Sequence, residues 1–276
     1  MPALVGLVAV VDSLDPVAIV TGAARGIGAA TALRLAADGW RLVLVDRCED
    51  DPHLPYPLGT KEDLRATCAA CGGDERASAV VADVRDQEAL DGAATAALER
   101  FGGLDAAVAI AGGIAGGQPA WLIDDGTWRT VLAVNLEGVW RLAKATVPAM
   151  MQRPQPRRGR FVAVSSVGGS LGLPLLSGYS AAKHGVIGFI KSLAAELGPE
   201  GITANVVAPG STATAMLEAS ATVYDLPSTA DFASHHPLGR LVQPAEVAAM
   251  LAWICGPESG AVTGAVLAID AGMTAS

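Results

Sequence analysis

Short apolar runs alternate with segments of helical period along most of the chain. The runs expected to form strands are residues 17–21, 41–46, 78–82, 105–111, 161–165, 202–208 and 265–269. Helical spacing is found at 26–39, 61–70, 86–100, 125–151 and 178–197, and a shorter helix is expected to open at Pro244. The strand-like runs are apolar throughout rather than alternating with polar positions, which indicates strands covered on both faces.

This order of elements predicts an α/β fold, a doubly wound Rossmann fold whose seven-stranded parallel sheet carries helices on both faces. No internal repeat and no long linker divides the chain. We therefore expect one domain over residues 17–276, preceded by an extension at 1–16. Two segments interrupt the alternation, an insert at 47–60 and an irregular stretch at 211–236.

Composition narrows the classes of function. The 276 residues are 51% hydrophobic and 17% charged, with a net charge of −9. An acidic chain is not attracted to nucleic acid or to an anionic membrane, and no stretch is apolar enough for a membrane helix. Cys48, Cys68, Cys71 and Cys255 form no disulfide or zinc-site pattern. We expect a soluble, cytoplasmic protein without a metal site.

A glycine-rich turn follows the first strand. The sequence TGAARGIG places Gly22, Gly26 and Gly28 where the chain passes from a strand into a helix. Such glycines permit a tight turn and bring backbone N–H groups and a helix N-terminus against a pyrophosphate. The glycines alone also fit an ordinary tight turn, so their position after the first strand decides the interpretation. Arg25 and Ile27 belong to the same candidate dinucleotide site.

The second strand ends in Asp46, about 18 residues beyond Gly28. A carboxylate there accepts hydrogen bonds from the ribose hydroxyls of adenosine and repels a 2′-phosphate, which favours NAD over NADP. Arg25 and Arg47 oppose this, since either guanidinium suits a phosphate. Because a phosphate beside Asp46 would add a like-charge contact, we predict NAD.

Three side chains that suit hydride transfer to or from a carbonyl occur together in VAVSSVGGSLGLPLLSGYSAAKHG. Ser166 ends a strand, and Tyr179 and Lys183 lie four residues apart on one face of a predicted helix. These positions belong to the carboxyl edge of the sheet, where open α/β folds bind ligands. An adjacent ammonium favours a phenolate, so we expect Lys183 to lower the pKa of Tyr179.

The motifs, in this order, resemble the short-chain dehydrogenase/reductase family over nearly all of residues 17–273. The resemblance rests on TGxxxGxG, the strand-end aspartate, ADV, VNLEG, S-x12-YxxxK and APG. It implies that Tyr179 is the acid/base, that Ser166 hydrogen-bonds the substrate oxygen and that Lys183 binds the nicotinamide ribose. It also implies that Asn135 anchors a water of the proton relay.

The resemblance further implies cofactor contacts and an assembly. The contacts are Asp83 and Val84 at the adenine, Ala111 and Gly112 beside the cofactor, and Pro209, Gly210, Thr212 and Thr214 at the carboxamide and a phosphate. The implied assembly is a homotetramer or homodimer built from the helices that begin near residues 125 and 178.

Two positions depart from the family pattern. Where the family usually has Asn-Asn-Ala-Gly after the fourth strand, residues 109–112 read Ala-Ile-Ala-Gly. The hydrogen bonds by which that asparagine braces the sheet are therefore expected to be absent. Asp-Gly-Gly after the last strand becomes Asp-Ala-Gly at 270–272. Neither change removes a catalytic group.

The insert at 47–60 is longer than most connections between a strand and a helix. Its PYPL run resembles the mycofactocin-associated subgroup of the family, which implies NAD that does not exchange and a separate, peptide-derived redox carrier. The prolines lower the cost of ordering the loop, and we predict a lid over NAD in which Leu54 or Tyr56 covers the adenine. An idle surface loop is the alternative. Thr60 and Asp63 predict a capped helix just beyond.

Residues 211–236 correspond to the family's variable substrate lid. Their apolar members predict an apolar pocket: Met216, Leu217, Tyr224 and Phe232. His235 and His236 are interpreted as part of a structural loop rather than as substrate ligands, and Trp121 and Trp128 as packing residues.

Taken together, the motifs predict an NAD-dependent oxidoreductase for a small to medium, apolar secondary alcohol or ketone. One alternative is a 3-oxoacyl thioester reductase of the acyl-carrier-protein type that uses NADPH, against which Asp46 argues. Another is a non-catalytic NAD-binding protein, against which the complete set of Asn135, Ser166, Tyr179 and Lys183 argues.

Overall fold

One parallel sheet runs through residues 15–275, the part of the chain that the computed structural model describes. Its strands are β1 (Val17–Thr21), β2 (Arg41–Asp46), β3 (Ala77–Val81), β4 (Ala106–Ala109), β5 (Arg160–Val164), β6 (Thr203–Pro209) and β7 (Val266–Ile269). Within this part of the chain the seven strands lie in the order β3-β2-β1-β4-β5-β6-β7. The doubly wound, seven-stranded fold is confirmed. The expected extension at 1–16, except its last two residues, lies outside the described residues.

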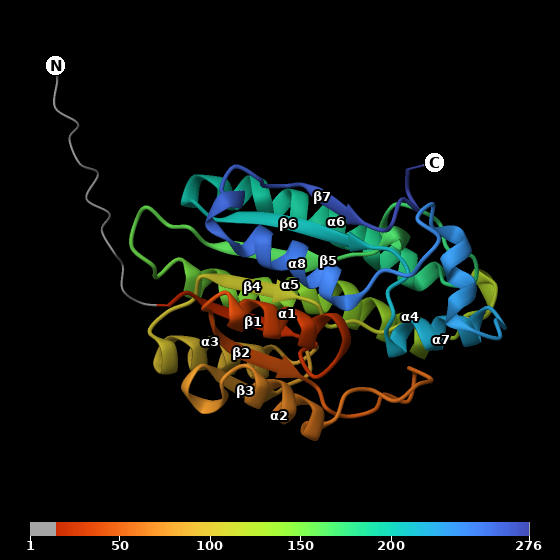
Figure 1. Cartoon of the computed structure of the whole chain (residues 1–276), viewed down its shortest axis with the longest axis horizontal. Coiled ribbons are helices and arrows are strands. Elements are labelled where there is room, and N and C mark those ends of the chain that lie inside the picture. The colour runs from red at the N-terminus through yellow and green to blue at the C-terminus, as the bar shows by residue number, and fades with distance from the viewer. Residues whose placement is uncertain (1–14, 276) are drawn as a thin grey trace, which may run out of the picture.

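Helices cover both faces of the sheet (Figure 1). They are α1 (Gly26–Ala37), α2 (Lys61–Ala70), α3 (Gln87–Phe101), α4 (Asp125–Leu132), α5 (Gly138–Met150), α6 (Ser177–Leu197), α7 (Ala215–Val223) and α8 (Pro244–Cys255). α1, α2 and α8 pack on one face, and α3, α5 and α6 on the other. α4 lies against α6.

Buried apolar strands hold the sheet between these two layers. All five residues of β1 are at most 1% exposed, and β2, β4 and β5 are buried nearly throughout. Complete burial of an aliphatic side chain contributes roughly 1.5–3 kcal/mol relative to leaving it exposed. The uninterrupted apolar runs of the sequence therefore account for the central strands.

Two predicted segments differ from the structure. The single helix expected at 125–151 is α4 and α5 joined by a π-helical turn, Ala133–Glu137. The stretch at 211–236, expected to be irregular, contains α7 and a 3-10 segment, Thr229–His235. Apolar side chains of α7 pack into two small clusters, one of which also contains Phe232 of the 3-10 segment, and this gives the stretch a buried face.

β1 and β4 are neighbours in the sheet, although β2 and β3 come between them in sequence. The chain leaves β1 toward α1 on one face and leaves β4 toward α4 on the other. Where the chain diverges in this way, a crevice opens at the carboxyl ends of the two strands, and folds of this kind bind ligands there.

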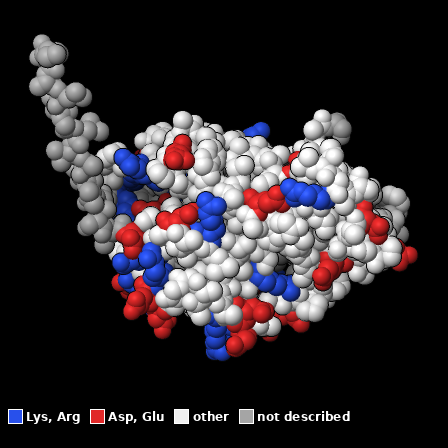
Figure 2. Space-filling view, viewed as in Figure 1, with Lys and Arg blue, Asp and Glu red and all other residues white. Residues whose placement is uncertain are grey.

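Acidic and basic side chains are interspersed on the face shown in Figure 2, with wide uncharged areas between them. The described part of this face therefore offers no continuous basic surface of the kind that binds nucleic acid. Among residues 15–275, no helix is long and apolar enough to cross a membrane.

Candidate active site

Two adjoining cavities open at the carboxyl edge of the sheet. The glycine-turn cavity, of about 420 Å³, lies beside the turn after β1, and the tyrosine cavity, of about 490 Å³, lies beside Tyr179. Both cavities share five lining residues: Ile27, Ile110, Gly112, Thr214 and Met216. The two cavities therefore form one continuous groove.

The residues predicted to contact a cofactor all line this groove. The glycine-turn cavity is lined by Gly22, Arg25, Gly26, Ile27, Gly28, Asp46, Arg47, Asp83, Val84, Ala111, Gly112 and Thr214. The tyrosine cavity is lined by Ser166, Tyr179, Lys183, Pro209, Gly210, Thr212 and Thr214. Contact with a cofactor itself stays a prediction.

At two positions of the turn after β1, only glycine fits. Gly22 has a φ of +70°, and a Cβ there would lie 2.9 Å from the backbone of Ala111. A Cβ on Gly28 would lie 1.9 Å from the carbonyl oxygen of Gly22. Arg25, the N-cap of α1, makes no capping bond with its side chain. The backbone N–H groups in the first turn of α1 therefore stay able to donate hydrogen bonds to an anionic ligand.

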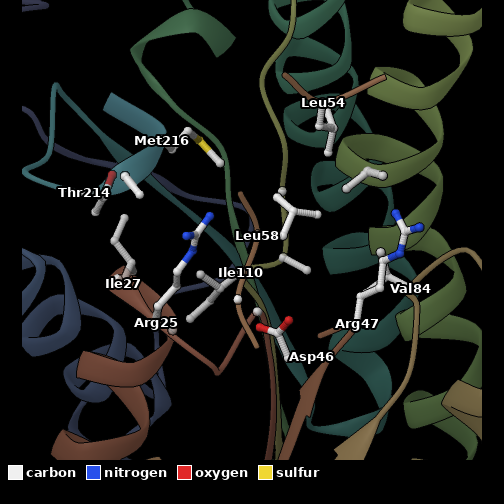
Figure 3. Close-up of a pocket in the computed structure, with 18 of the residues that line it drawn as sticks. Arg25, Ile27, Asp46, Arg47, Leu54, Leu58, Val84, Ile110, Thr214 and Met216 are labelled. Atoms are coloured by element: carbon white, nitrogen blue, oxygen red, sulfur yellow. The ribbon is translucent and has the colours of Figure 1, made fainter. Parts of the chain in front are cut away.

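Asp46 is held in place by two backbone N–H groups at the end of β2. Its carboxylate accepts a hydrogen bond from Ala24 at 3.0 Å and another from Cys48 at 3.2 Å. Figure 3 shows the carboxylate between Arg25 on one side and Arg47 on the other. The negative charge is thus fixed among the residues that line the glycine-turn cavity.

The two arginines that the sequence left as candidate phosphate ligands both have protein partners. Arg25 donates a hydrogen bond to the carbonyl oxygen of Pro57 at 2.5 Å. Arg47 pairs with Asp51 at 2.5 Å and with Asp83 at 3.3 Å. Because its charge is already offset by two carboxylates, Arg47 has little attraction left for a 2′-phosphate.

A buried carboxylate, Asp51, anchors the insert beside these groups. Arg85 lies 2.9 Å from Asp51 and 2.6 Å from Asp83, and so bridges the two. Burial alone would raise the pKa of Asp51, but the His53 N–H and the nearby guanidiniums keep it below its ordinary value. Sequence reasoning missed Asp51 and Arg85, because an acidic run in a loop resembles solvated charge. The available signal was an arginine two residues beyond Asp83.

Ser166, Tyr179 and Lys183 converge where β5 ends and α6 begins. Ser166 follows β5, and its hydroxyl oxygen accepts the N–H of Gly168 at 3.1 Å. Tyr179 and Lys183 lie one helical turn apart and are 7% and 4% exposed. The Lys183 Nζ lies 5.6 Å from the centroid of the Tyr179 ring and donates to the carbonyl oxygen of Val164 at 2.9 Å. The predicted trio shares one wall of the tyrosine cavity.

Burial dominates the ionisation of this pair. It raises the pKa of Tyr179 to about 12, and a hydrogen bond with Ser166 offsets this only in part. Burial also lowers the pKa of Lys183 to about 8. The pKa of Tyr179 is therefore raised on balance in the protein chain alone, whereas the sequence led us to expect a net lowering, because burial outweighs any effect of the neighbouring ammonium.

Asn135 lies fully buried in the π-helical turn between α4 and α5. Its amide nitrogen donates to the carbonyl oxygens of Gly113 and Val131, both at 2.8 Å, and its oxygen accepts the Gly113 N–H at 3.2 Å. These bonds satisfy an amide that would be costly to bury unpaired. A Cβ on Gly112 would lie 2.9 Å from the Asn135 oxygen and 3.7 Å from the Lys183 Nζ. The water-holding role of Asn135 stays a prediction.

Thr21 braces the end of β4 in place of the missing asparagine. Its hydroxyl oxygen accepts the N–H of Ile110 at 3.1 Å and the N–H of Ala111 at 3.2 Å. Because these two N–H groups bond to a side chain, β4 ends at Ala109 rather than at the predicted residue 111. The hydrogen bonds that the family's asparagine would make cannot form here, because residue 109 is alanine. Thr21 holds the loop after β4 instead. The sequence signal was the threonine that opens TGxxxGxG.

The insert crosses the groove and packs against the loop after β4. A Cβ on Gly113 would lie 2.6 Å from the Leu54 side chain, which therefore covers this glycine. The Tyr56 hydroxyl oxygen accepts the N–H of Ile114 at 3.2 Å. Leu54 and Tyr56 belong to one apolar cluster with Ile114 and Tyr179. Both side chains also line the glycine-turn cavity, and the prediction that one of them covers the adenine stays a prediction.

Apolar side chains cover the tyrosine cavity on its outer side. α7 and the segment after it supply the predicted set to the cavity wall: Met216, Leu217, Tyr224 and Phe232. Lys183 is the only lysine or arginine among the residues that line this cavity. The cavity therefore suits an uncharged, largely apolar molecule.

The two adjacent histidines have different surroundings. His236 is buried, accepts the Ser211 N–H through Nε2 at 3.2 Å and bonds the Arg240 carbonyl oxygen through Nδ1 at 2.8 Å. It is structural, as expected. His235 lines the tyrosine cavity with its ring edge-on to Phe232, although it was interpreted as a loop residue.

The two tryptophans also differ. Trp128 lies against Gly178 of α6, where a Cβ would be 3.3 Å from its ring, in agreement with a packing role. Trp121 is 83% exposed and so packs little within one chain.

Known proteins resemble this chain over nearly its full length. Residues 22–274 match a family model described as Enoyl-(Acyl carrier protein) reductase. An uncharacterized oxidoreductase of Mycobacterium tuberculosis is 41% identical over 93% of this chain and 95% of its own. The short-chain reductase NovJ of Streptomyces niveus is 39% identical over 94% of each chain. The crystal structure of carveol dehydrogenase from Mycobacterium avium in complex with NAD matches with a TM-score of 0.90 at 36% identity, covering 96% of this chain and 99% of that one.

Proposed function

The chain belongs to the short-chain dehydrogenase/reductase family, and we propose that it transfers a hydride between NAD and a secondary alcohol or ketone. The observation that carries this proposal is the convergence of Ser166, Tyr179 and Lys183 on one wall of the tyrosine cavity. That wall adjoins the glycine-turn cavity, whose residues fit a dinucleotide. A hydride acceptor bound along the groove would therefore meet a substrate beside Tyr179.

The side chains have distinct roles in this reaction. Bound NAD supplies the hydride acceptor. In the oxidation direction the Tyr179 phenolate takes the alcohol proton, and Ser166 hydrogen-bonds the same oxygen as it becomes a carbonyl. The Lys183 ammonium favours the phenolate, offsetting part of the effect of burial. We further propose that Asn135 positions the water through which this proton leaves the site.

The proposed cofactor is NAD rather than NADP. The support is the Asp46 carboxylate, which is fixed in the glycine-turn cavity and would repel a 2′-phosphate, and Arg47, which is already paired with two carboxylates. Each tenfold preference corresponds to about 1.4 kcal/mol. We expect kcat/KM with NADH to exceed that with NADPH at least about tenfold. A clear preference for NADPH would overturn the assignment.

The proposed substrate is a small to medium, apolar secondary alcohol or its ketone. The tyrosine cavity has a volume of about 490 Å³ and a mainly apolar wall, so a compact ring or chain with one oxygen fits it. A protein named carveol dehydrogenase is similar over 96% of this chain, and carveol is such a molecule. Carveol is therefore the first alcohol to assay.

We also propose that NAD is held through many turnovers and is reoxidised in place by a peptide-derived redox carrier. The support is the insert, which crosses the groove and is fixed by Arg25, Asp51 and Tyr56. Protein purified without added cofactor should keep one NAD per chain after extensive dilution, as mass spectrometry and absorbance can measure. Loss of NAD on dilution, or rapid steady turnover with free NAD, would contradict the proposal and favour the alternative that the insert is an idle surface loop.

The main alternative is a 3-oxoacyl thioester reductase that uses NADPH, in line with the description of the matched family model. Such a substrate arrives on an acidic carrier protein. The lid at 211–236 carries three carboxylates, Glu218, Asp225 and Asp231, and no lysine or arginine. Like charges would oppose docking there, and Asp46 opposes NADPH.

Assembly and location complete the proposal. We propose that the protein forms a homotetramer or homodimer in which α4 and α6 make the contacts between subunits. We also propose that it is cytoplasmic. Trp128, 38% exposed beside α6, supports a partner on this face. Sedimentation of the purified protein would measure the assembly, and a monomer would contradict it.

A further inference from the structure

Tyr56 joins the insert to the catalytic side of the groove. Its phenol oxygen accepts the N–H of Ile114 at 3.2 Å, across 58 positions of sequence. Its ring packs in the same apolar cluster as Leu176 and Tyr179. Burial raises the pKa of Tyr56 further above physiological pH, so the group is a neutral phenol, whose oxygen still has lone pairs with which to accept the Ile114 N–H.

The contact at Ile114 continues to the catalytic residues through the backbone before it. Gly113 exchanges two hydrogen bonds with Asn135, one at 3.2 Å and one at 2.8 Å. Gly112 lies so close to Asn135 and Lys183 that an added Cβ would be 2.9 Å from the amide oxygen and 3.7 Å from the ammonium nitrogen. A continuous set of contacts therefore runs from the insert to Asn135.

The residues on either side of Tyr56 fix its place. Pro57, the next residue, accepts a hydrogen bond from Arg25 at 2.5 Å. Leu54, two residues before, covers Gly113 with its side chain. With the insert held at both points, the phenol has little freedom to leave Ile114.

We propose that Tyr56 is a positioning residue for hydride transfer: it holds the Gly113–Ile114 backbone, and thereby Asn135, in place. The inference rests on the proposed function and gives the insert a part in the reaction that neither an idle loop nor a simple cover would have. Tyr56 lines the glycine-turn cavity and not the tyrosine cavity. Its loss should therefore slow the reaction without weakening substrate binding.

The variant that tests this role is Tyr56→Phe, which removes the phenol oxygen and keeps the ring. His53→Ala is the matched control, because this insert side chain packs on Gly126 at the start of α4, away from Ile114. The assay is single-turnover reduction of protein-bound NAD by a panel of cyclic secondary alcohols that includes carveol.

Tyr56→Phe should lower the saturating rate about 10- to 100-fold. The alcohol concentration for half saturation should stay within about twofold, since Tyr56 does not line the tyrosine cavity. His53→Ala should keep both values near those of the wild type. A saturating rate within about twofold of the wild type, or a loss confined to half saturation, would overturn the role.

Amide hydrogen exchange tests the same contact without turnover. In Tyr56→Phe the amides of Ile114 and Gly113 should exchange at least about tenfold faster, because the Ile114 N–H loses its acceptor. In His53→Ala they should not change. Unchanged exchange in Tyr56→Phe would overturn the inference even in an active enzyme. A wild-type protein that oxidises no alcohol would overturn the proposed function, and the exchange data separate the two failures.

Discussion

Tyr179 and Lys183 have pKa values displaced in opposite directions by the same enclosure. Burial raises the pKa of the phenol to about 12 and lowers that of the ammonium to about 8. Both shifts favour the neutral forms, although the proposed chemistry needs a phenolate beside an ammonium. At neutral pH the Lys183 ammonium still predominates, whereas the Tyr179 phenolate is strongly disfavoured, and displaced pKa values of this kind are common where catalytic groups are buried.

Lys183→Met should reveal this strain in the free energy of unfolding. The folded pKa of Lys183, about 8, lies below its ordinary 10.5, so the unfolded chain binds more protons between these values. Wild-type stability therefore gains from Lys183 as pH rises from about 8 to about 10.5. We expect the difference in stability between wild type and Lys183→Met to move in favour of the wild type across this window, as measured by denaturant unfolding.

Lys191→Met serves as the control for that measurement. Lys191 is exposed on the same helix, so its removal should leave the pH dependence of stability unchanged. A Lys183→Met protein whose stability follows that of the wild type at every pH would show that Lys183 is not desolvated.

For single residues, the sequence predicts contacts between positions that are close along the chain. Tyr179 and Lys183 are four residues apart in a helix, so their spacing was enough to predict that they lie on the same face. The burial that sets their pKa values comes from Val164, Ile114 and other residues of distant segments. No pattern near the tyrosine reveals these neighbours, which is why the direction of its pKa was predicted wrongly.

The start of α2 shows a single element specified by its own residues. The Thr60 hydroxyl accepts the Asp63 N–H at 3.1 Å, and the Asp63 carboxylate accepts the Thr60 N–H at 2.9 Å. This capping box was predicted from the spacing of the two side chains, and it is confirmed.

Thr60→Ala should lower the free energy of unfolding by about 1 kcal/mol, because the Asp63 N–H loses its acceptor. Thr60→Ser keeps the hydroxyl and should lie much closer to the wild type. Chemical denaturation of the three proteins measures the difference. Equal losses in both variants would assign the effect to the lost methyl group rather than to the cap.

The insert and the π-helical turn show elements that sequence does not specify locally. Asp51 is buried only because Arg47 and Arg85 surround it, and Arg85 follows a different strand. The turn at Ala133–Glu137 accompanies the bonds between Asn135 and Gly113, which lies 22 positions earlier. Such features depend on contacts between segments that are distant in sequence. The helical periodicity of 125–151 carries no information about these contacts, and it therefore predicted one continuous helix.

For the molecule as a whole, the order of elements was enough to predict the fold and the edge of the sheet at which the predicted lining residues meet. Alternating strands and helices require a parallel sheet, and the topology brings the carboxyl ends of β1, β4 and β5 together. The predicted lining residues converge there because each follows one of the strands. What sequence could not give is the set of contacts that holds the two predicted lids: residues of the insert line the glycine-turn cavity, and residues of α7 line both cavities.

Reduction of protein-bound NAD by a secondary alcohol tests the central claim most directly. Protein carrying NAD is mixed with carveol and related cyclic alcohols, and the absorbance of the reduced nicotinamide is followed for wild type and Tyr179→Phe. The wild type should reduce its NAD. Tyr179→Phe should hold the same amount of NAD and react at least about 100-fold more slowly, because the proton acceptor is lost. Equal rates in the two proteins would contradict the proposed role of Tyr179.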